Sequence, residues 1–471
     1  MKRALVIAAF LASGCKVGDD YVRPPLHAPA QFEFAQDQVQ LEARWWRQFG
    51  DPTLDALIER ALRSNLDLKI ALARLREARA VITIAGGEGR PQADAGGSFA
   101  RREPSTEVAF GQFFPPSDNS FHSAGFRASW ELDLFGRVAR GVEAASAEYD
   151  IAVEDVHATL VVLCADLARH YVELRGFEEQ VSILERELTL QADTAELVRS
   201  RAQAGLEDEL ALARIEGLIA STRARLPELE RERAARQHAL ATLLGVWPRE
   251  LVDELDAGRR ALTPPVALTT GAPAQLLERR ADVRRAEREL ARASAQNAQA
   301  RAELYPRISL GAALGLESER LDDLFQSGAR TWSVGPSFTL PLLRGGLLRA
   351  GIAVRTAQAE AAALRYAQAG LAALADAETA LAAWRRAGER AVELEAARAA
   401  DVRAEALARE RYAGGLDNFL SVLDARRSLL ASESQLAAAR SELAAAAVAV
   451  YRALGGGWEL EGELEELVAT R

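Results

Sequence analysis

The chain contains segments in which every second residue is apolar. This alternation is clear over residues 124–134, 308–316 and 332–340, and it is weaker over residues 93–101. A period of two predicts strands that present one apolar and one polar face. Each segment has about 10 residues, the length of a tilted strand that crosses a membrane. We therefore expect two pairs of membrane strands, and a soluble antiparallel sheet is the alternative.

Each strand pair is followed by a very long helical segment. Residues 136 to about 203 and 345 to about 413 contain no proline and are rich in Ala, Leu, Glu and Arg. At 1.5 Å per residue, each predicts a helix of roughly 100 Å. Helices of that length have to pack side by side to bury their apolar positions. Pro227 interrupts the helix that returns after the first of them, whereas residues 416–454 contain no proline, so we expect a kink near Pro227.

The N-terminal part carries weaker periodicity. From Tyr21 to Trp45-Trp46 the chain is polar and contains several prolines, which predicts an irregular strap along the outside of the body. Asp51-Pro52 then opens a short helix, and residues 66 to about 85 predict a second one. Residues 281–302 read as a copy of that second helix.

Residues 411–455 read as an ungapped second copy of residues 201–245. Arg201, Gly205, Leu210 and Gly245 recur 210 positions later as Arg411, Gly415, Leu420 and Gly455. Each copy predicts a helix, a turn at a left-handed glycine and a second helix. The repeat is much longer than a solenoid unit, so it indicates duplication of a half-domain. The predicted division is a signal peptide at 1–14, a first half at 15–245 and a second half at 246–471.

The N-terminus resembles a bacterial lipoprotein signal. Met1-Lys2-Arg3 is followed by an apolar run and by Ser13-Gly14-Cys15. The resemblance implies cleavage before Cys15 and a covalent lipid on its thiol; no other cofactor is expected. Lys16 follows in place of the Asp that retains such lipoproteins in the inner membrane, which favours the outer membrane. A plain cleaved signal is the alternative.

Composition and motifs exclude several functions. A net charge of −10 and a pI near 5.4 argue against nucleic acid as a partner, because no basic stripe is present to neutralise phosphates. The 5 histidines are scattered without metal-ligand spacing, and no nucleophile-elbow or phosphate-loop motif occurs, so we expect neither a metal site nor an enzyme. Cys164 lies in an apolar helical run and is expected to be a small buried residue.

Four strands cannot close on themselves. An open sheet edge in lipid would leave backbone groups unpaired at a cost of several kcal/mol each. Subunits are therefore expected to share one barrel. Because single-chain barrels begin at eight strands, two, three or more copies are geometrically possible.

Five motifs together resemble the outer-membrane efflux proteins of the TolC and OprM type, especially their lipoprotein branch. They are SWELDLFGR at 129–137, Trp45-Trp46 with Asp51-Pro52, NLDL at 65–68, RRADV at 279–283 and ALGGGW at 453–458. Ala281 stands where the family usually has proline. The resemblance implies a mainly α-helical homotrimer with a 12-stranded membrane β-barrel, continuous with a barrel of α-helices that forms a large periplasmic portion.

The same resemblance implies the function. The chain would be the exit duct of a tripartite efflux pump in the outer membrane, anchored by its lipid. Its partners would be a periplasmic adaptor and an inner-membrane transporter that supplies the energy. A duct for type I protein secretion uses the same fold and is one alternative. The other is a structural lipoprotein that spans the periplasm as a coiled coil, which would need heptads without intervening strands.

Two sets of site residues follow. Arg201 with Gly205 and Leu212, and Arg411 with Gly415 and Val422, are similar to the family pattern at the tip that meets the adaptor. The alternative is that the two glycine turns are purely structural.

The second set is a predicted gate. Leu420, Asp424 and Arg427 are spaced to share one helical face just after Gly415, and they resemble the constriction of OprM-type ducts. Arg214 stands in the first repeat where the second has Asp424. Pairing of Asp424 with Arg427 or Arg214 is expected to hold the tip closed and to leave a cation-favouring constriction. An ordinary solvated Asp/Arg pair is the alternative.

Overall fold

The computed structural model describes residues 16–29, 31–33, 43–102, 119–205, 208–257 and 273–458. The predicted signal peptide and Cys15 lie outside these ranges. The chain divides into two compact units, and each unit takes segments from both halves of the sequence. Unit 1 comprises Met1–Pro25, Arg74–Val153 and Arg285–Ala367, and unit 2 comprises Leu26–Ala73, Glu154–Arg284 and Gln368–Arg471.

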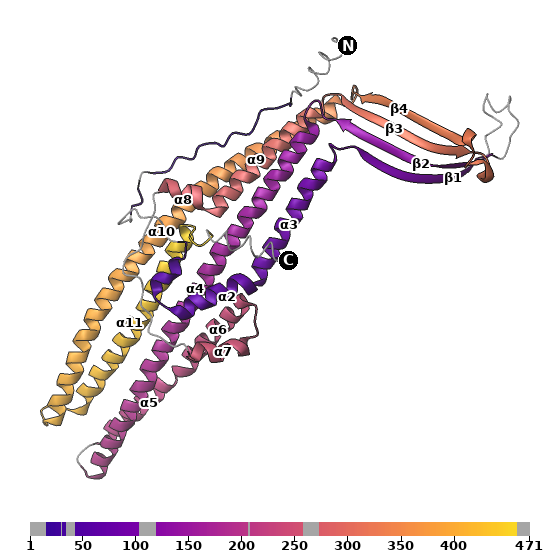
Figure 1. Cartoon of the computed structure of the whole chain (residues 1–471). Coiled ribbons are helices and arrows are strands. Elements are labelled where there is room, and N and C mark those ends of the chain that lie inside the picture. The colour runs from indigo at the N-terminus through magenta and orange to yellow at the C-terminus, as the bar shows by residue number, and fades with distance from the viewer. Residues whose placement is uncertain are drawn as a thin grey trace. The chain divides into compact units, whose positions relative to one another are not determined.

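Helices account for most of the described residues (Figure 1). The α-helices are α2 (Pro52–Ser64), α3 (Leu66–Gly87), α4 (Arg137–Gln203), α5 (Glu209–Arg223), α6 (Leu226–Leu244), α7 (Pro248–Ala257), α8 (Pro273–Arg279), α9 (Ala281–Ala302), α10 (Gly345–Ala413) and α11 (Phe419–Ala453). Short 3₁₀-helices are η1 (Trp45–Phe49), η2 (Leu321–Asp323) and η3 (Ser327–Ala329). The two long helices have 67 and 69 residues, which confirms the prediction from their composition. The short helices α7 and α8 were not predicted.

Unit 1 contains one four-stranded sheet. Its strands are β1 (Gln92–Arg102), β2 (Asn119–Leu132), β3 (Arg307–Ser318) and β4 (Arg330–Thr339). They lie in the order β1-β2-β3-β4, and every neighbouring pair is antiparallel (Figure 1). All four predicted strands are confirmed. The central ladder pairs β2 from the first half of the sequence with β3 from the second, so neither half completes the sheet alone.

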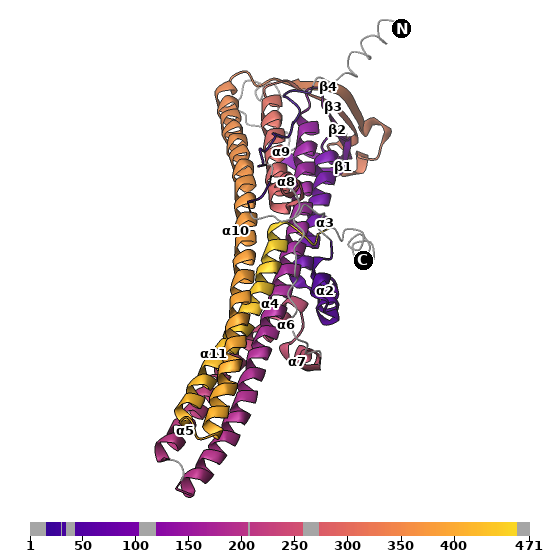
Figure 2. The same ribbon diagram turned by 90° about the vertical axis from the view of Figure 1, so that its left-hand side faces the viewer.

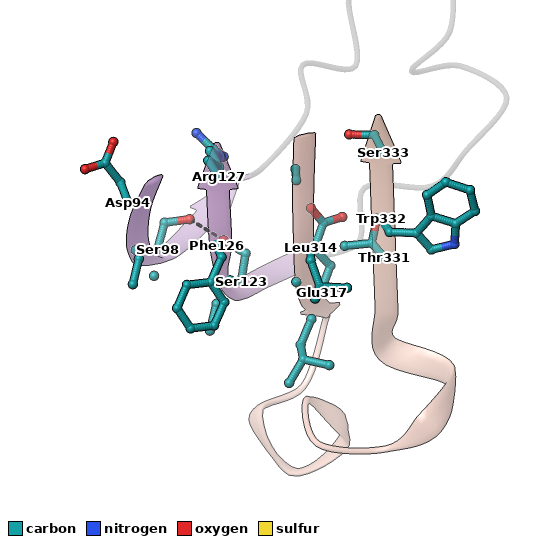
Figure 3. A pocket seen from close by; sticks show the side chains of 18 residues that line it. Asp94, Ser98, Ser123, Phe126, Arg127, Leu314, Glu317, Thr331, Trp332 and Ser333 are labelled. Atoms are coloured by element: carbon teal, nitrogen blue, oxygen red, sulfur yellow. Dashed lines mark hydrogen bonds between the residues drawn. The ribbon is translucent and has the colours of Figure 1, made fainter. Parts of the chain in front are cut away.

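The two faces of the sheet differ as the alternation predicts. Phe126 is opposite Leu314, which is opposite Trp332, and these three residues are 63%, 62% and 74% exposed. The neighbouring row on the other face is Asp94, Arg127, Ala313 and Ser333. The hydroxyls of Ser98 and Ser123 meet across β1 and β2 on that polar face at 2.8 Å (Figure 3). A single chain therefore leaves a row of large apolar side chains uncovered.

The irregular strap is fixed to the start of α4 within unit 1. The Arg140 side chain is only 2% exposed, and its guanidinium donates to the carbonyls of Val17 at 3.3 Å and Gly18 at 2.7 Å. It also pairs with Asp20 at 3.0 Å. The Val17 amide donates to the carbonyl of Phe135 at 3.1 Å. The first described residues are thus held where β2 gives way to α4.

The strap does not stay on the outside as far as Trp45-Trp46, which corrects the prediction. Both tryptophans lie in η1 and are at most 2% exposed. The Trp45 ring stacks on Tyr451 with 4.8 Å between the ring centroids. The Tyr451 hydroxyl donates to Gln48 at 2.5 Å. The aromatic side chains drive this segment inward, because burying them removes a large apolar area from water.

The first return helix is interrupted next to Pro227, as the sequence predicted. α5 ends at Arg223 and α6 begins at Leu226, with Pro227 in the first turn of α6. Proline lacks the amide hydrogen that would continue the helix, so a new helix begins there. The matching return helix, α11, runs for 35 residues without interruption. No helix in the described ranges combines the length and the apolar character that spanning a membrane requires.

Cys164 is the buried small residue that the sequence predicted. It lies in the part of α4 that belongs to unit 2 and is 1% exposed, and burial raises the pKa of its thiol to about 12. At pH 8 only about 10⁻⁴ of such thiols are ionised, compared with about a quarter for a thiol with the ordinary pKa.

We therefore predict that a maleimide will not label Cys164 in the folded protein at pH 8 but will label it in guanidinium chloride. Mass spectrometry of the intact chain measures this. Thr189→Cys, at an exposed position of the same helix, is the matched control and should be labelled without denaturant. Rapid labelling of Cys164 in the folded state would contradict the prediction.

Candidate functional site

Both predicted glycine turns are present in unit 2. Gly205 follows α4 with φ of 72°, and Gly415 follows α10 with φ of 70°, so both take the left-handed conformation. The Leu416 amide donates to the carbonyl of Arg411 at 2.9 Å, which closes the end of α10. A Cβ atom at Gly205 or Gly415 would meet nothing within 4 Å. Glycine is needed at these turns for backbone conformation and not for space.

Each turn leads into a capped helix. The Asp208 carboxylate accepts from the amide of Leu210 at the start of α5, and the Asn418 side chain accepts from the amide of Ser421 at the start of α11. The Ser421 hydroxyl and the Asn418 amide also donate to Asp417, which holds the pKa of its carboxyl below the usual value. These bonds satisfy amides that have no partner within the helix.

The two hairpins, α4–α5 and α10–α11, run alongside each other (Figure 2) and meet in an apolar cluster next to the turns. We call this the tip cluster; its members are Ala195, Val198, Ile215, Leu218, Phe419, Val422 and Leu423. Val422, predicted as part of the docking pattern, is thus buried at 6% exposure, and Leu212 packs partly buried against the cluster. Val422 and Leu212 therefore pack within the tip and hold its helices together.

The arginines of the docking pattern contact their own chain. The Arg201 guanidinium lies 5.1 Å from the centre of the Tyr412 ring, and this contact joins the ends of α4 and α10. Arg411 pairs with Asp417 at 3.5 Å across the second turn. The Arg411 side chain remains 60% exposed and is available to a partner. Gly205 and Gly415 are also exposed.

The three predicted gate residues share an exposed face of α11. Leu420 is 38% exposed, and the side chains of Asp424 and Arg427 are 63% and 66% exposed. Asp424 and Arg427 form an ion pair with 3.9 Å between oxygen and nitrogen. The opposite face, with Phe419 and Val422, is buried. The predicted spacing therefore places these three side chains together on the surface of the single chain.

Arg214 reaches the same place from the first hairpin. It is exposed on α5 and lines a shallow groove of about 150 Å³ between α5 and α11, together with Leu210 and Leu420. The two repeats thus bring their matching leucines to one groove.

Arg426 is the residue that the sequence reasoning missed. It stands between Asp424 and Arg427 in the chain, yet its side chain is only 9% exposed. An Arg-Arg pair in an Ala-rich helix is ordinarily solvated, so the sequence carried no signal for its burial. The helix caps could have been found, since Asp208 lies two residues and Asn418 one residue before an apolar run. Among the described residues, no group of three or more His, Cys, Asp or Glu side chains could hold a metal ion.

The family model for outer membrane efflux proteins matches residues 57–246 and 272–456. This chain belongs to the family of outer membrane efflux proteins. The two matched ranges end one residue beyond Gly245 and Gly455, the left-handed glycines that close the two repeats. The predicted resemblance is therefore confirmed. As a member of this family, the chain is an outer-membrane exit duct for efflux and a transport protein.

Individual relatives of this outer membrane efflux protein match over nearly its full length. It is 31% identical over 469 residues to the toluene efflux pump outer membrane protein TtgF of Pseudomonas putida, which covers 95% of both chains. It is 32% identical to the pyoverdine export outer membrane protein OpmQ of Pseudomonas aeruginosa, covering 97% of both. The solved outer-membrane channel OprN superposes with a TM-score of 0.88 at 36% identity, covering 94% of this chain and 100% of that one.

Proposed function

We propose that this protein is a lipid-anchored homotrimer that conducts small molecules passively out of the cell, as the last component of a tripartite pump. One observation carries the proposal. A single chain joins a sheet with an exposed apolar face to two long helical hairpins that end in glycine turns. A lipid-facing sheet and a hairpin tip are the two surfaces that a duct between a membrane and a periplasmic partner requires.

The two sheet edges support a barrel shared between subunits, for which the family resemblance implies three copies. Within the described residues, β1 and β4 each pair on one side only. In lipid their free backbone groups need partners, and β4 of one subunit can pair with β1 of the next. Three copies of four strands form a 12-stranded barrel, which is within the range of known membrane barrels. We infer that closure of this barrel assembles the subunits.

Small-molecule export is favoured over protein secretion by the relatives. TtgF is named for toluene efflux and OpmQ for pyoverdine export, and both match over at least 95% of their length. The four strands count against a purely structural coiled-coil spacer. The energy for transport would come from an inner-membrane transporter, joined to this duct by a periplasmic adaptor at the glycine turns.

The lipid anchor is supported by the strap. Arg140 and Phe135 hold the backbone of Val17 and Gly18, so residue 15 is attached to a segment fixed near the end of β2.

We predict that the mature N-terminus is an acylated Cys15. Mass spectrometry of the N-terminal peptide decides this, and an unmodified Cys15 or a later start would contradict it. Cys15→Ser should lower assembly efficiency more than it alters the fold.

For the docking tip we predict that Gly415→Val will reduce crosslinking to the adaptor while the amount of trimer stays normal. The left-handed conformation costs a residue with a Cβ about 1–2 kcal/mol, and that strain distorts the turn locally. Gly414→Ala is the matched control, because Gly414 has an ordinary φ and its added Cβ would lie 3.5 Å from the nearest atom. Loss of the trimer in Gly415→Val would instead mean that the turn is purely structural.

For the gate we predict that Asp424→Ala with Arg427→Ala will raise the conductance of the purified protein in planar bilayers and weaken its cation preference. Three subunits repeat each lost charge around the axis, which amplifies the effect. Arg385→Ala with Glu389→Ala removes an exposed ion pair from α10 and is the control. If assembled trimers keep their conductance and selectivity, the pair is a solvated surface pair of about 0.2–0.5 kcal/mol and not a gate.

A further inference from the structure

Arg426 faces away from the predicted gate although it is next to it in the sequence. The side chains of Asp424 and Arg427 are 63% and 66% exposed, whereas that of Arg426 is 9% exposed. A helix turns about 100° per residue, so adjacent positions can lie on opposite faces. A buried guanidinium needs several acceptors to offset the water that it loses.

Two hydrogen-bond acceptors on α4 and a carboxylate on α10 surround the guanidinium of Arg426. Arg426 Nη1 donates to the carbonyl of Leu190 at 3.2 Å and to the hydroxyl of Thr194 at 2.9 Å, both on α4. Its Nε lies 3.7 Å from a carboxylate oxygen of Glu405 on α10. The Thr194 hydroxyl donates its own proton to the Leu190 carbonyl at 2.7 Å, which leaves its lone pairs for Arg426. One side chain thus joins α11 to both long helices.

Gln191 on α4 and Thr222 on α5 extend this group of polar side chains to a fourth helix. Gln191, next to Leu190 on α4, is fully buried and donates to Thr222 on α5 at 3.2 Å and to Glu187 at 2.9 Å. Burial raises the pKa of the Glu187 carboxyl, and the positive charge of Arg426 partly offsets this rise. We call this group the polar layer; its members are Glu187, Gln191, Thr194, Thr222, Glu405 and Arg426.

The polar layer lies between two apolar clusters. On its turn side is the tip cluster, with Val198 on α4 and Val422 on α11. On its other side is a cluster that includes Leu184 on α4 and Leu430 on α11. Apolar contacts are not directional, so these clusters decide which face of α11 is buried but leave small shifts in its rotation cheap. A buried guanidinium permits no such freedom, because any rotation leaves its charge without partners.

We propose that Arg426 is the positioning residue of the constriction: it fixes the rotation of α11 against α4 and α10, and thereby aims Leu420, Asp424 and Arg427 at the duct axis. This inference rests on the proposed function of those three residues as a gate. It adds that the gate is set from inside each subunit and not only by contacts between subunits. Arg426 itself touches no transported molecule.

The test measures conductance and cation preference in planar bilayers. Arg426→Met removes the charge at similar volume, and Arg426→Met with Glu405→Leu removes both charges, so that no buried carboxylate is left unpaired. We expect both variants to form trimers, to conduct more and to lose cation preference. Arg390→Met is the matched control, because Arg390 on α10 joins α11 through an exposed pair with Glu442 and its loss should leave conductance unchanged.

A double-mutant cycle distinguishes the positioning role of Arg426 from the gate role of Asp424 and Arg427. If Arg426 acts through Asp424 and Arg427, adding Arg426→Met to Asp424→Ala with Arg427→Ala raises conductance no further than that pair alone. Fully additive increases would overturn the positioning role. So would wild-type conductance in trimers of both Arg426 variants. Asp424→Ala with Arg427→Ala could have no effect while the Arg426 variants raise conductance. In that case the proposed gate fails, and Arg426 sets the width by holding α11 and not by aiming Asp424 and Arg427.

Discussion

The backbone ladder between β2 and β3 is the constraint on which the rest of this protein depends. Each half of the duplicated sequence supplies two strands, and only pairing across the halves makes a sheet of four. The pairing has eleven residues on each strand in register, from His122 with Ser318 to Leu132 with Ile308. Through this pairing the chain returns to the same sheet after the whole first hairpin. Both long helices therefore follow a strand of one sheet, α4 after β2 and α10 after β4.

The duplication is close in backbone and loose in side chains. Gly205, Gly245, Gly415 and Gly455 all take the left-handed conformation, which repeats the same two turns in each half. The side chains between them have diverged. Pro227 splits the first return helix, whereas α11 is continuous. Arg214 occupies the position of the first repeat that corresponds to Asp424 in the second. A duct built from two such hairpins presents different charges from each, although its frame is pseudo-symmetric.

Polar and apolar contacts have separate roles in unit 2. The tip cluster and the cluster around Leu184 hold the helices together by burying one apolar face of α11. The polar layer between them supplies directional bonds from Arg426 to α4 and α10. A buried ion pair contributes little net stability, because the cost of desolvating its charges offsets the attraction. We therefore assign Arg426 an orienting role, because α11 carries the proposed gate residues on its other face.

The sequence by itself determined the strands, the long helices, the glycine turns and the family, because these depend on local periodicity and on motifs that need no contacts. Alternation predicted all four strands, absence of proline predicted α4 and α10, and glycine after each helix predicted the left-handed turns. It also placed Leu420, Asp424 and Arg427 on one face. Only the tertiary structure decided that Trp45 and Trp46 are buried, that Val422 belongs to the core and that Arg426 points inward. Burial depends on which helices meet. The two hydrogen-bond acceptors of Arg426 lie more than 200 positions away on α4, where no local pattern could indicate them.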